Sequence, residues 1–257
     1  MSKARLRLDA WLVKQGIATD VAHAKTLVDQ GLILVNGSIA LTDNRMIANS
    51  DSVLLSTPAR FVSRGGDKLE AALLSFGVEL DGKRVLDVGA STGGFTDCVL
   101  QRGAGEVMSL DVGKSQLHDR LVRDPRVKVL DSTNARTITS AQVGHFDVVV
   151  ADLSFISLRQ VATALCEVLR PHGDMILLVK PQFEAEKSEV DKGAGVIRDV
   201  EIHQRTIAQV VGAFNSQGME KSGLIESPLR GADGNTEFLL HLRRKSASGT
   251  HSVSGVE

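Results

Sequence analysis

The fold is decided by the stretch Val85-Leu-Asp-Val-Gly-Ala-Ser-Thr-Gly-Gly-Phe95. The apolar residues up to Val88 are typical of a buried strand, the glycines allow a tight turn, and the residues from Gly94 onward favour a helix. In this arrangement the backbone N–H groups of the turn point toward a ligand beyond the carboxyl end of the strand. The stretch therefore predicts a ligand-binding loop in an α/β fold.

The glycine pattern excludes two common ligands of such loops. A dinucleotide-binding loop has the pattern G-x-G-x-x-G, but Ser91 occupies the position of its second glycine. A triphosphate-binding loop requires a lysine directly after Gly94, and Phe95 stands there instead. A ligand without phosphate fits better. The methionine part of S-adenosylmethionine offers a carboxylate to the N–H groups of the turn and an ammonium group to Asp87.

Two further carboxylates end the strands expected to follow. Asp111 is placed to accept both hydrogens of a ribose diol, as the acid of dinucleotide-binding enzymes does. Asp131 is placed to reach the adenine amino group. The alternative is a glycine turn that serves only close packing of strand and helix. The residues expected to bind S-adenosylmethionine are Asp87, Gly89, Ala90, Ser91, Thr92, Gly93, Asp111 and Asp131.

Short apolar strands alternate with amphipathic helices on both sides of this loop, which predicts a parallel sheet covered on both faces. Helices are expected over residues 67–76, 94–101, 114–122, 158–169 and 200–214, and strands over 84–88, 106–110, 127–130, 147–151, 175–179, 220–225 and 238–242. Because only a loop joins the last two strands, the final strand is expected to be antiparallel. The prediction is a Rossmann-like sheet of the class I methyltransferase type.

A small α+β domain is expected to precede this sheet. Helices are predicted over residues 8–16 and 20–30, with Asp20 as the N-cap of the second. A hairpin follows over 32–41, because Asn36-Gly37 suits a type I′ turn, and one more strand covers 51–55. The predicted organisation is a first domain at 1–57, a linker at 58–66, a second domain at 67–244 and a disordered tail at 245–257.

Composition and charge restrict the class of protein. The apolar fraction of 42% and the net charge of −1 are ordinary for a globular protein. Residues 1–60 carry seven Lys and Arg against five Asp, which favours contact of this part with a polyanion. Neither Cys98 and Cys166 nor the seven histidines have metal-ligand spacing, so no metal site is predicted. The lack of a signal peptide or long apolar run predicts a cytoplasmic protein without a membrane partner.

Four polar residues are candidates for the chemistry. Asp152 and Lys180 follow the fourth and fifth strands, so both belong at the crevice beside the glycine loop. Desolvation of Lys180 after an apolar strand disfavours its charged form and prepares it for acid–base work. Lys68 begins a helix and Glu237 opens the last strand. Each residue also has an ordinary structural alternative, such as an exposed helix lysine, a helix N-cap or an edge-strand charge.

The chain resembles a known family in its motifs. It is similar to the hemolysin-A-type (TlyA) ribosomal RNA 2′-O-methyltransferases, which join an S4-type RNA-binding domain to an FtsJ-like methyltransferase domain. The resemblance covers about residues 4–244. The matching stretches are Arg7-Leu-Asp-Ala-Trp-Leu-Val, Val35-Asn-Gly, Val62-Ser-Arg-Gly-Gly-Asp-Lys-Leu69, Asp87-Val-Gly-Ala-Ser-Thr-Gly-Gly-Phe-Thr-Asp97, Asp152-Leu-Ser-Phe-Ile-Ser157, Lys180-Pro-Gln-Phe-Glu184 and Gly234-Asn-Thr-Glu237.

The resemblance implies an activity and the residues that perform it. It implies a catalytic Lys-Asp-Lys-Glu tetrad, carried here onto Lys68, Asp152, Lys180 and Glu237. It also implies S-adenosylmethionine as cofactor and 2′-O-methylation of cytidines in 16S and 23S ribosomal RNA, with ribosomal subunits as partners. S4-type domains usually carry Ser-Arg at the start of the second helix, where this chain has Thr19-Asp20-Val21. The residues expected to contact RNA are Arg5, Arg7, Lys14, Lys25 and Arg64.

Two other classes of function stay open at this point. One is a non-catalytic RNA-binding or ribosome-assembly factor that keeps the methyltransferase fold as a scaffold. The other is a membrane-active hemolysin, which the absence of any long apolar segment disfavours.

Overall fold

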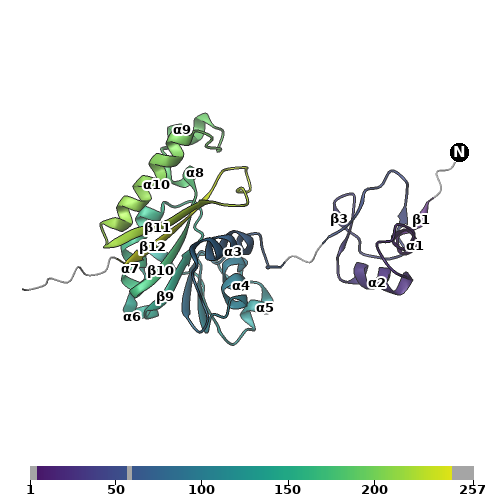
Figure 1. Cartoon of the computed structure of the whole chain (residues 1–257), viewed down its shortest axis with the longest axis horizontal. Helices are drawn as coiled ribbons and strands as arrows, with labels where there is room; N and C mark the ends of the chain where they lie inside the picture. Colours follow the sequence, from purple (N-terminus) through teal and green to yellow (C-terminus); the bar gives the residue numbers. More distant parts are fainter. Residues whose placement is uncertain (1–4, 57–59, 245–257) are drawn as a thin grey trace, which may run out of the picture. The chain divides into compact units, whose positions relative to one another are not determined.

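The computed structural model describes residues 5–56 and 60–244 of a chain that divides into two compact units, Met1–Ala59 and Arg60–Glu257 (Figure 1). The boundary falls within the segment 58–66 that the sequence assigned to a linker. The first two residues of that segment and the tail predicted at 245–257 lie outside the described residues.

The first unit is a small α+β domain. Its two helices pack on short antiparallel strands, and the strand order of its larger sheet is β3-β2-β5. The side chain of Asp20 accepts the N–H of His23 at 2.8 Å and caps the second helix, as predicted. Asn36 and Gly37 both have positive φ and form the predicted hairpin turn. The elements are β1 Leu6–Arg7, α1 Leu8–Lys14, α2 Val21–Asp29, β2 Ile33–Val35, β3 Ser38–Ile39, β4 Met46–Ile47 and β5 Val53–Leu55.

The second unit is built on a seven-stranded sheet with the order β11-β12-β10-β9-β6-β7-β8. The five strands from β10 to β8 are parallel, and β12 pairs antiparallel with both β10 and β11. This confirms the predicted Rossmann-like sheet with an antiparallel last strand. The strands are β6 Arg84–Val88, β7 Glu106–Leu110, β8 Val127–Leu130, β9 Phe146–Ala151, β10 Leu169–Val179, β11 Met219–Glu226 and β12 Phe238–Arg244.

Helices cover both faces of this sheet because its strands are apolar on both sides. One face is covered by α3 Gly65–Phe76, α4 Gly94–Gln101 and α5 Asp119–Val122. The other face is covered by the segments η1 Ala135–Thr137, α6 Ser140–Val143, η2 Leu158–Gln160, α7 Ala162–Val168 and α10 Val200–Asn215. Two short helices, α8 Pro181–Glu184 and α9 Lys187–Lys192, follow β10.

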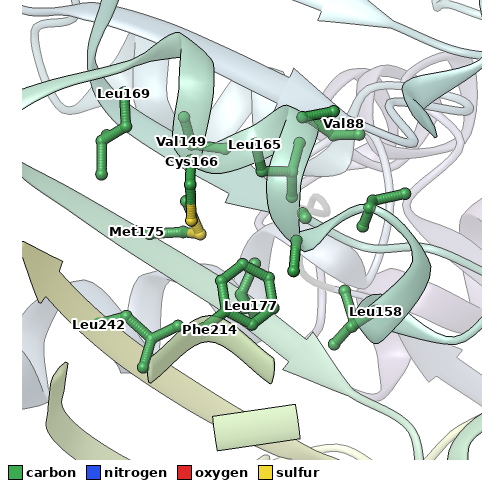
Figure 2. Close-up of a cluster of buried hydrophobic side chains, with 14 of the residues drawn as sticks. Val88, Val149, Leu158, Leu165, Cys166, Leu169, Met175, Leu177, Phe214 and Leu242 are labelled. Carbon is green, nitrogen blue, oxygen red and sulfur yellow. The ribbon is translucent and has the colours of Figure 1, made fainter. Parts of the chain in front are cut away.

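Figure 2 shows the core of the second face, where Met175 and Leu177 of β10, Cys166 of α7 and Phe214 of α10 belong to one buried cluster. All four side chains are buried. Burial of apolar side chains of this size contributes on the order of 1.5–3 kcal/mol each. This packing holds the parallel strands together, with their carboxyl ends at one edge of the sheet.

Two expected helices differ from the structure. The helix predicted at 114–122 is reduced to α5, because Ser115 has a left-handed backbone (φ +54°) and its N–H donates to Asp131 at 2.8 Å. The helix predicted at 158–169 is divided into η2 and α7. The strand predicted at 175–179 is longer and begins at Leu169.

Residues 60–66 belong to the second unit. Phe61 is buried in its core, and the N–H of Val62 donates to Asp97 Oδ2 at 2.8 Å. A Cβ on Gly66 would lie 2.2 Å from the side chain of Phe61, so the glycine is needed for this close approach. The segment therefore reaches the sheet as an ordered part of the second unit.

Candidate active site

The glycine loop joins β6 to α4 with a backbone that requires its glycines. Gly89 and Gly93 have φ of +85° and +98°. A Cβ on Gly89 would lie 2.4 Å from the carbonyl oxygen of Asp152, and one on Gly93 would lie 2.3 Å from the side chain of Leu121. The loop therefore lies directly against the end of β9, so residues of the two segments share one site.

Asp111 follows β7 and connects the end of that strand to the glycine loop. Its carboxylate accepts the N–H of Ser91 at 2.8 Å and the N–H of Gly113 at 2.7 Å. The residue is half-buried and lines a cleft beside the loop. A carboxylate at the end of this strand can also accept hydrogen bonds from a ribose diol.

Two adjoining clefts lie at the carboxyl ends of the strands, and they share Gly89, Ser91, Asp152 and Ser154. The first cleft, of about 280 Å³, is mainly polar and is lined by Ser63, Arg64, Gly65, Lys68, Gly89, Ala90, Ser91, Thr92, Gly94, Phe95, Asp152, Ser154 and Lys180. The second, of about 550 Å³, has more apolar walls and is lined by Gly89, Ser91, Leu110, Asp111, Val112, Gly113, Gln116, Thr133, Asn134, Ala135, Arg136, Asp152, Leu153, Ser154, Phe155 and Ile156.

Three of the four candidate catalytic residues line the first cleft, and the fourth is bound to one of them. Lys180 Nζ lies 2.6 Å from Asp152 Oδ1 and donates to Ser154 Oγ at 2.9 Å. Lys68 Nζ donates to Glu237 Oε2 at 2.5 Å. The side chains of Lys68, Lys180 and Glu237 are at most 10% exposed. The structure thus brings two ammonium–carboxylate pairs to one crevice.

The loop before β12 brings Glu237 to this position. A Cβ on Gly231 would lie 2.7 Å from Glu237 Oε1, so this glycine leaves space for the carboxylate. Buried Asn235 fastens the same loop, since its side chain accepts the N–H of Ile197 and donates to the carbonyl of Gly195, each at 2.9 Å. Glu237 therefore reaches Lys68 from a rigid support.

Asp87 lies beneath the glycine loop and lines neither cleft. It is fully buried, its Oδ2 accepts the hydroxyl of Thr96 at 2.6 Å, and its Oδ1 has no hydrogen-bond partner among the described residues. Burial raises the pKa of Asp87 to about 7, and the Thr96 hydrogen bond opposes this rise. A buried carboxylate oxygen without a partner fits a cation bound at the loop, such as the ammonium group of S-adenosylmethionine.

The other residues predicted to bind the cofactor line either the first cleft or neither cleft. Ala90 and Thr92 line the first cleft, and Gly93 lines neither. Asp131 also lines neither cleft and accepts the N–H of Ser115 instead. Thr133, two residues further along, lines the second cleft in this region.

Sequence reasoning did not single out Ser154 or Phe155. Phe155 is 91% exposed, has a φ of +64° and contacts the ring of Phe183 at a centroid distance of 5.2 Å. Both missed residues line the second cleft. Their position inside the 152–157 motif was the available signal, but an exposed phenylalanine has no distinct pattern in a sequence.

The residues predicted to contact RNA are all exposed. In the first unit, Arg7 is held by Asp9 through Nη2–Oδ2 at 2.6 Å, whereas Lys14 ends α1 and Lys25 lies in α2. In the second unit, Arg64 lines the first cleft. Arg64 is therefore placed beside the ammonium–carboxylate pairs.

Within residues 5–56 and 60–244, no group of three or more His, Cys, Asp or Glu side chains is arranged to hold a metal ion. None of the helices that the structure describes is both long and apolar enough to cross a membrane.

Comparison with known proteins identifies the family. The model of FtsJ-like methyltransferases matches residues 61–244, and the S4 domain model matches residues 6–48. The chain belongs to the FtsJ-like methyltransferase family. The predicted combination of an S4 domain with an FtsJ-like domain is confirmed.

Relatives within this family match nearly the whole chain. The 16S/23S rRNA (cytidine-2′-O)-methyltransferase TlyA of Mycobacterium tuberculosis (strain ATCC 25618 / H37Rv) is 41% identical over 245 residues, which cover 94% of this chain and 91% of that protein. Hemolysin A of Brachyspira hyodysenteriae is 36% identical, with 92% and 99% covered. A structure from Streptococcus thermophilus, named as a candidate hemolysin, aligns with a TM-score of 0.72 at 36% identity and covers 95% of this chain and 90% of its own.

Proposed function

We propose that this protein transfers a methyl group from S-adenosylmethionine to the ribose 2′-hydroxyl of cytidines in 16S and 23S ribosomal RNA in the cytoplasm. The observation that carries the proposal is the position of Lys180 in the first cleft, where it is paired with Asp152 and Ser154, two residues that line both clefts. The printed activity of the Mycobacterium tuberculosis relative supports the choice of cytidine and ribosomal RNA.

The second cleft suits the nucleoside part of the cofactor. Asp111 can accept the ribose diol, and Val112, Leu153 and Ile156 supply apolar walls for a purine ring. The N–H groups of the glycine loop can hold the carboxylate of the methionine part. When bound there, S-adenosylmethionine supplies an electrophilic methyl group next to the first cleft.

In the first cleft, Lys180 is the group placed to act on the 2′-hydroxyl. A ribose hydroxyl is a poor nucleophile while it keeps its proton, so an acceptor for that proton accelerates attack by the 2′-oxygen. In the proposed step the Lys180 ammonium group first gives up one proton to solvent, Nζ then accepts the proton of the 2′-hydroxyl, and Asp152 stabilises the ammonium group that forms again. Ser154 fixes the direction of Nζ. Lys68 and Glu237 form the second pair, which holds the Lys68 ammonium group in place in the first cleft.

The target nucleotide must leave its base stack to reach this crevice. Phe155 presents an exposed ring at the second cleft, and unstacked bases commonly stack on such rings. Arg64 lines the adjoining first cleft and can contact a phosphate of the approaching strand. The S4 domain supplies further phosphate contacts, for which Lys14 and Lys25 are exposed.

The test uses the purified full-length protein with isolated small and large ribosomal subunits and methyl-labelled S-adenosylmethionine, followed by digestion to nucleosides. We expect the label in 2′-O-methylcytidine from both subunits, and a strongly reduced rate of labelling with Lys180→Ala. Label in a base would overturn the assignment of the acceptor. Cofactor and RNA binding without any methyl transfer would favour the non-catalytic assembly factor instead.

A further inference from the structure

Two segments that carry proposed catalytic residues follow neighbouring strands of the sheet. Residues 152–157 follow β9, and residues 180–184 follow β10. Near the strands, Lys180 joins the segments through Asp152 and Ser154. Four residues further along the second segment, Glu184 joins them again. The first segment is therefore fastened to the second at both of its ends.

The side-chain contacts of Glu184 go to the last residue of the first segment and to the two residues that follow it. Its Oε2 accepts the hydroxyl of Ser157 at 2.5 Å, and its Oε1 accepts the N–H of Leu158 at 2.6 Å. Arg159 donates to the Glu184 carboxylate at 3.3 Å and to its carbonyl oxygen at 3.1 Å. Glu184 is only 4% exposed. Hydrogen bonds to a buried carboxylate are stronger than those between neutral groups, so this connection is firm.

The segment between the two connections has an unfavourable backbone. Phe155 has a φ of +64°, a conformation that a residue with a bulky side chain rarely adopts, and its ring is almost fully exposed. Such a conformation persists only where surrounding contacts impose it. The Lys180–Ser154 hydrogen bond lies immediately before Phe155, and the Ser157–Glu184 hydrogen bond follows two residues later.

We propose that Glu184 is a positioning residue for methyl transfer, holding residues 152–157 so that Asp152 and Ser154 keep Lys180 aligned. Glu184 lines neither cleft, so it acts through this loop rather than on substrate or cofactor. The inference rests on the proposed function. It extends the catalytic site by one buried carboxylate that the tetrad does not include.

The test compares Glu184→Ala, Glu184→Gln and Ser157→Ala in the full chain. We expect Glu184→Ala to slow single-turnover methyl transfer roughly 10- to 100-fold, the usual effect of a small misplacement of reacting groups. Its cofactor affinity stays within about twofold, because hydrogen bonds of the glycine loop are intact. Glu184→Gln recovers most of the rate, since the amide can accept from Leu158 and donate to Ser157. Ser157→Ala gives an intermediate loss.

A second readout separates positioning from general stability. Val168→Ala removes methyl groups from the core at a fully buried site in α7 and lowers the melting temperature without touching the loop. We expect a changed pH dependence of the rate only in the Glu184 and Ser157 variants, because only these disturb the surroundings of Lys180. An unchanged rate and pH profile in folded Glu184→Ala would overturn the proposal.

Hydrogen exchange provides a measurement that does not depend on activity. Amide exchange of residues 153–158 should accelerate in Glu184→Ala, while residues 175–179 in the middle of the sheet remain protected. Unchanged exchange in the loop would refute the proposal even if the rate fell. If the wild-type protein fails to methylate ribosomal subunits but the loop still loosens in Glu184→Ala, the proposed function fails while the role of Glu184 in holding the loop stands.

Discussion

Replacing Glu237 by alanine should destabilise the second unit strongly. Lys68 and Glu237 meet at 2.5 Å with side chains 8% and 3% exposed, and Glu237 is the ion-pair partner of Lys68 within the described residues. Removal of the carboxylate leaves a buried ammonium group without a counter-charge, at a cost of about 3–5 kcal/mol. For a unit of this size each kcal/mol lowers the melting temperature by roughly 2–4 °C, so we expect a fall of about 6–20 °C.

A double variant distinguishes loss of the partner from loss of packing. Lys68→Met combined with Glu237→Leu replaces the buried pair by apolar groups of similar volume, which is often neutral or stabilising. We therefore expect the double variant to melt well above Glu237→Ala while lacking activity. Thermal unfolding of the second unit should be followed by far-ultraviolet circular dichroism. Tryptophan fluorescence is unsuitable, because the single tryptophan, Trp11, lies in the first unit.

A surface pair provides the control. Glu226 lies 3.8 Å from Arg230, with both side chains more than half exposed, so Glu226→Ala should change the melting temperature little. A fall of less than about 2 °C in Glu237→Ala would refute the argument, since it corresponds to less than 1 kcal/mol. A double variant as unstable as Glu237→Ala would show that packing, and not the unpaired charge, causes the loss.

Four further predictions follow from the site. Lys180→Ala should lose about 10²–10⁴ in single-turnover rate with cofactor affinity retained. Lys180→Arg should also lose most of the single-turnover rate, and a near-normal rate for this variant would exclude proton abstraction by Lys180. Asp111→Ala should weaken S-adenosylmethionine binding by about 1.5–3 kcal/mol in calorimetry, and unchanged affinity would remove Asp111 from the cofactor site. Because burial raises the pKa of Asp87 to about 7, its ionised fraction grows as pH rises from 6 to 8, and cofactor affinity should grow with it by up to about tenfold. Asp87→Asn should abolish this pH dependence, and a wild-type affinity that falls over the same interval would contradict the sign. Replacing Lys14 and Lys25 by glutamate should reduce the slope of log K against log salt concentration for ribosomal RNA binding. The expected reduction is about 0.7–0.9 for each lost phosphate contact. An unchanged slope would place the RNA contacts elsewhere.

The sheet could be predicted from the sequence because each strand is a short apolar run bounded by turn residues. The glycine loop at 89–94 marks one strand end, and the missing helix between the last two strands indicates the antiparallel β12. Asn36-Gly37 specifies its turn through local backbone preferences alone. Such features depend on neighbouring residues, so a single sequence is sufficient.

The elements that sequence reasoning missed depend on contacts distant along the chain. The helix expected at 114–122 has suitable periodicity, but the hydrogen bond from Ser115 to Asp131 holds its first residues in a turn. The short helix α9 is a different case, because its capping box at Glu186 is a local feature but the helix has no apolar stripe to reveal it.

The residues of the candidate site also divide into those that the sequence pattern places together and those that only distant contacts bring together. Strand order predicts that Asp152 and Lys180 share a crevice, because their strands are neighbours. No local pattern could pair Lys68 with Glu237, which lie 169 residues apart. Glu184 was quoted only as part of a motif, since its partners Ser157 and Leu158 lie 27 and 26 residues away.

The insertion of β12 between β10 and β11 sets an order of events during synthesis of the protein. Domains generally begin to fold from the amino-terminal side as the chain emerges. Here the interior of the sheet stays open until β12, the last of the described strands to be synthesised, takes its place between β10 and β11. Glu237 directly precedes that strand, so the polar crevice gains its fourth side chain only at this step. A nascent chain on the ribosome would therefore remain inactive until translation of the catalytic unit is nearly finished.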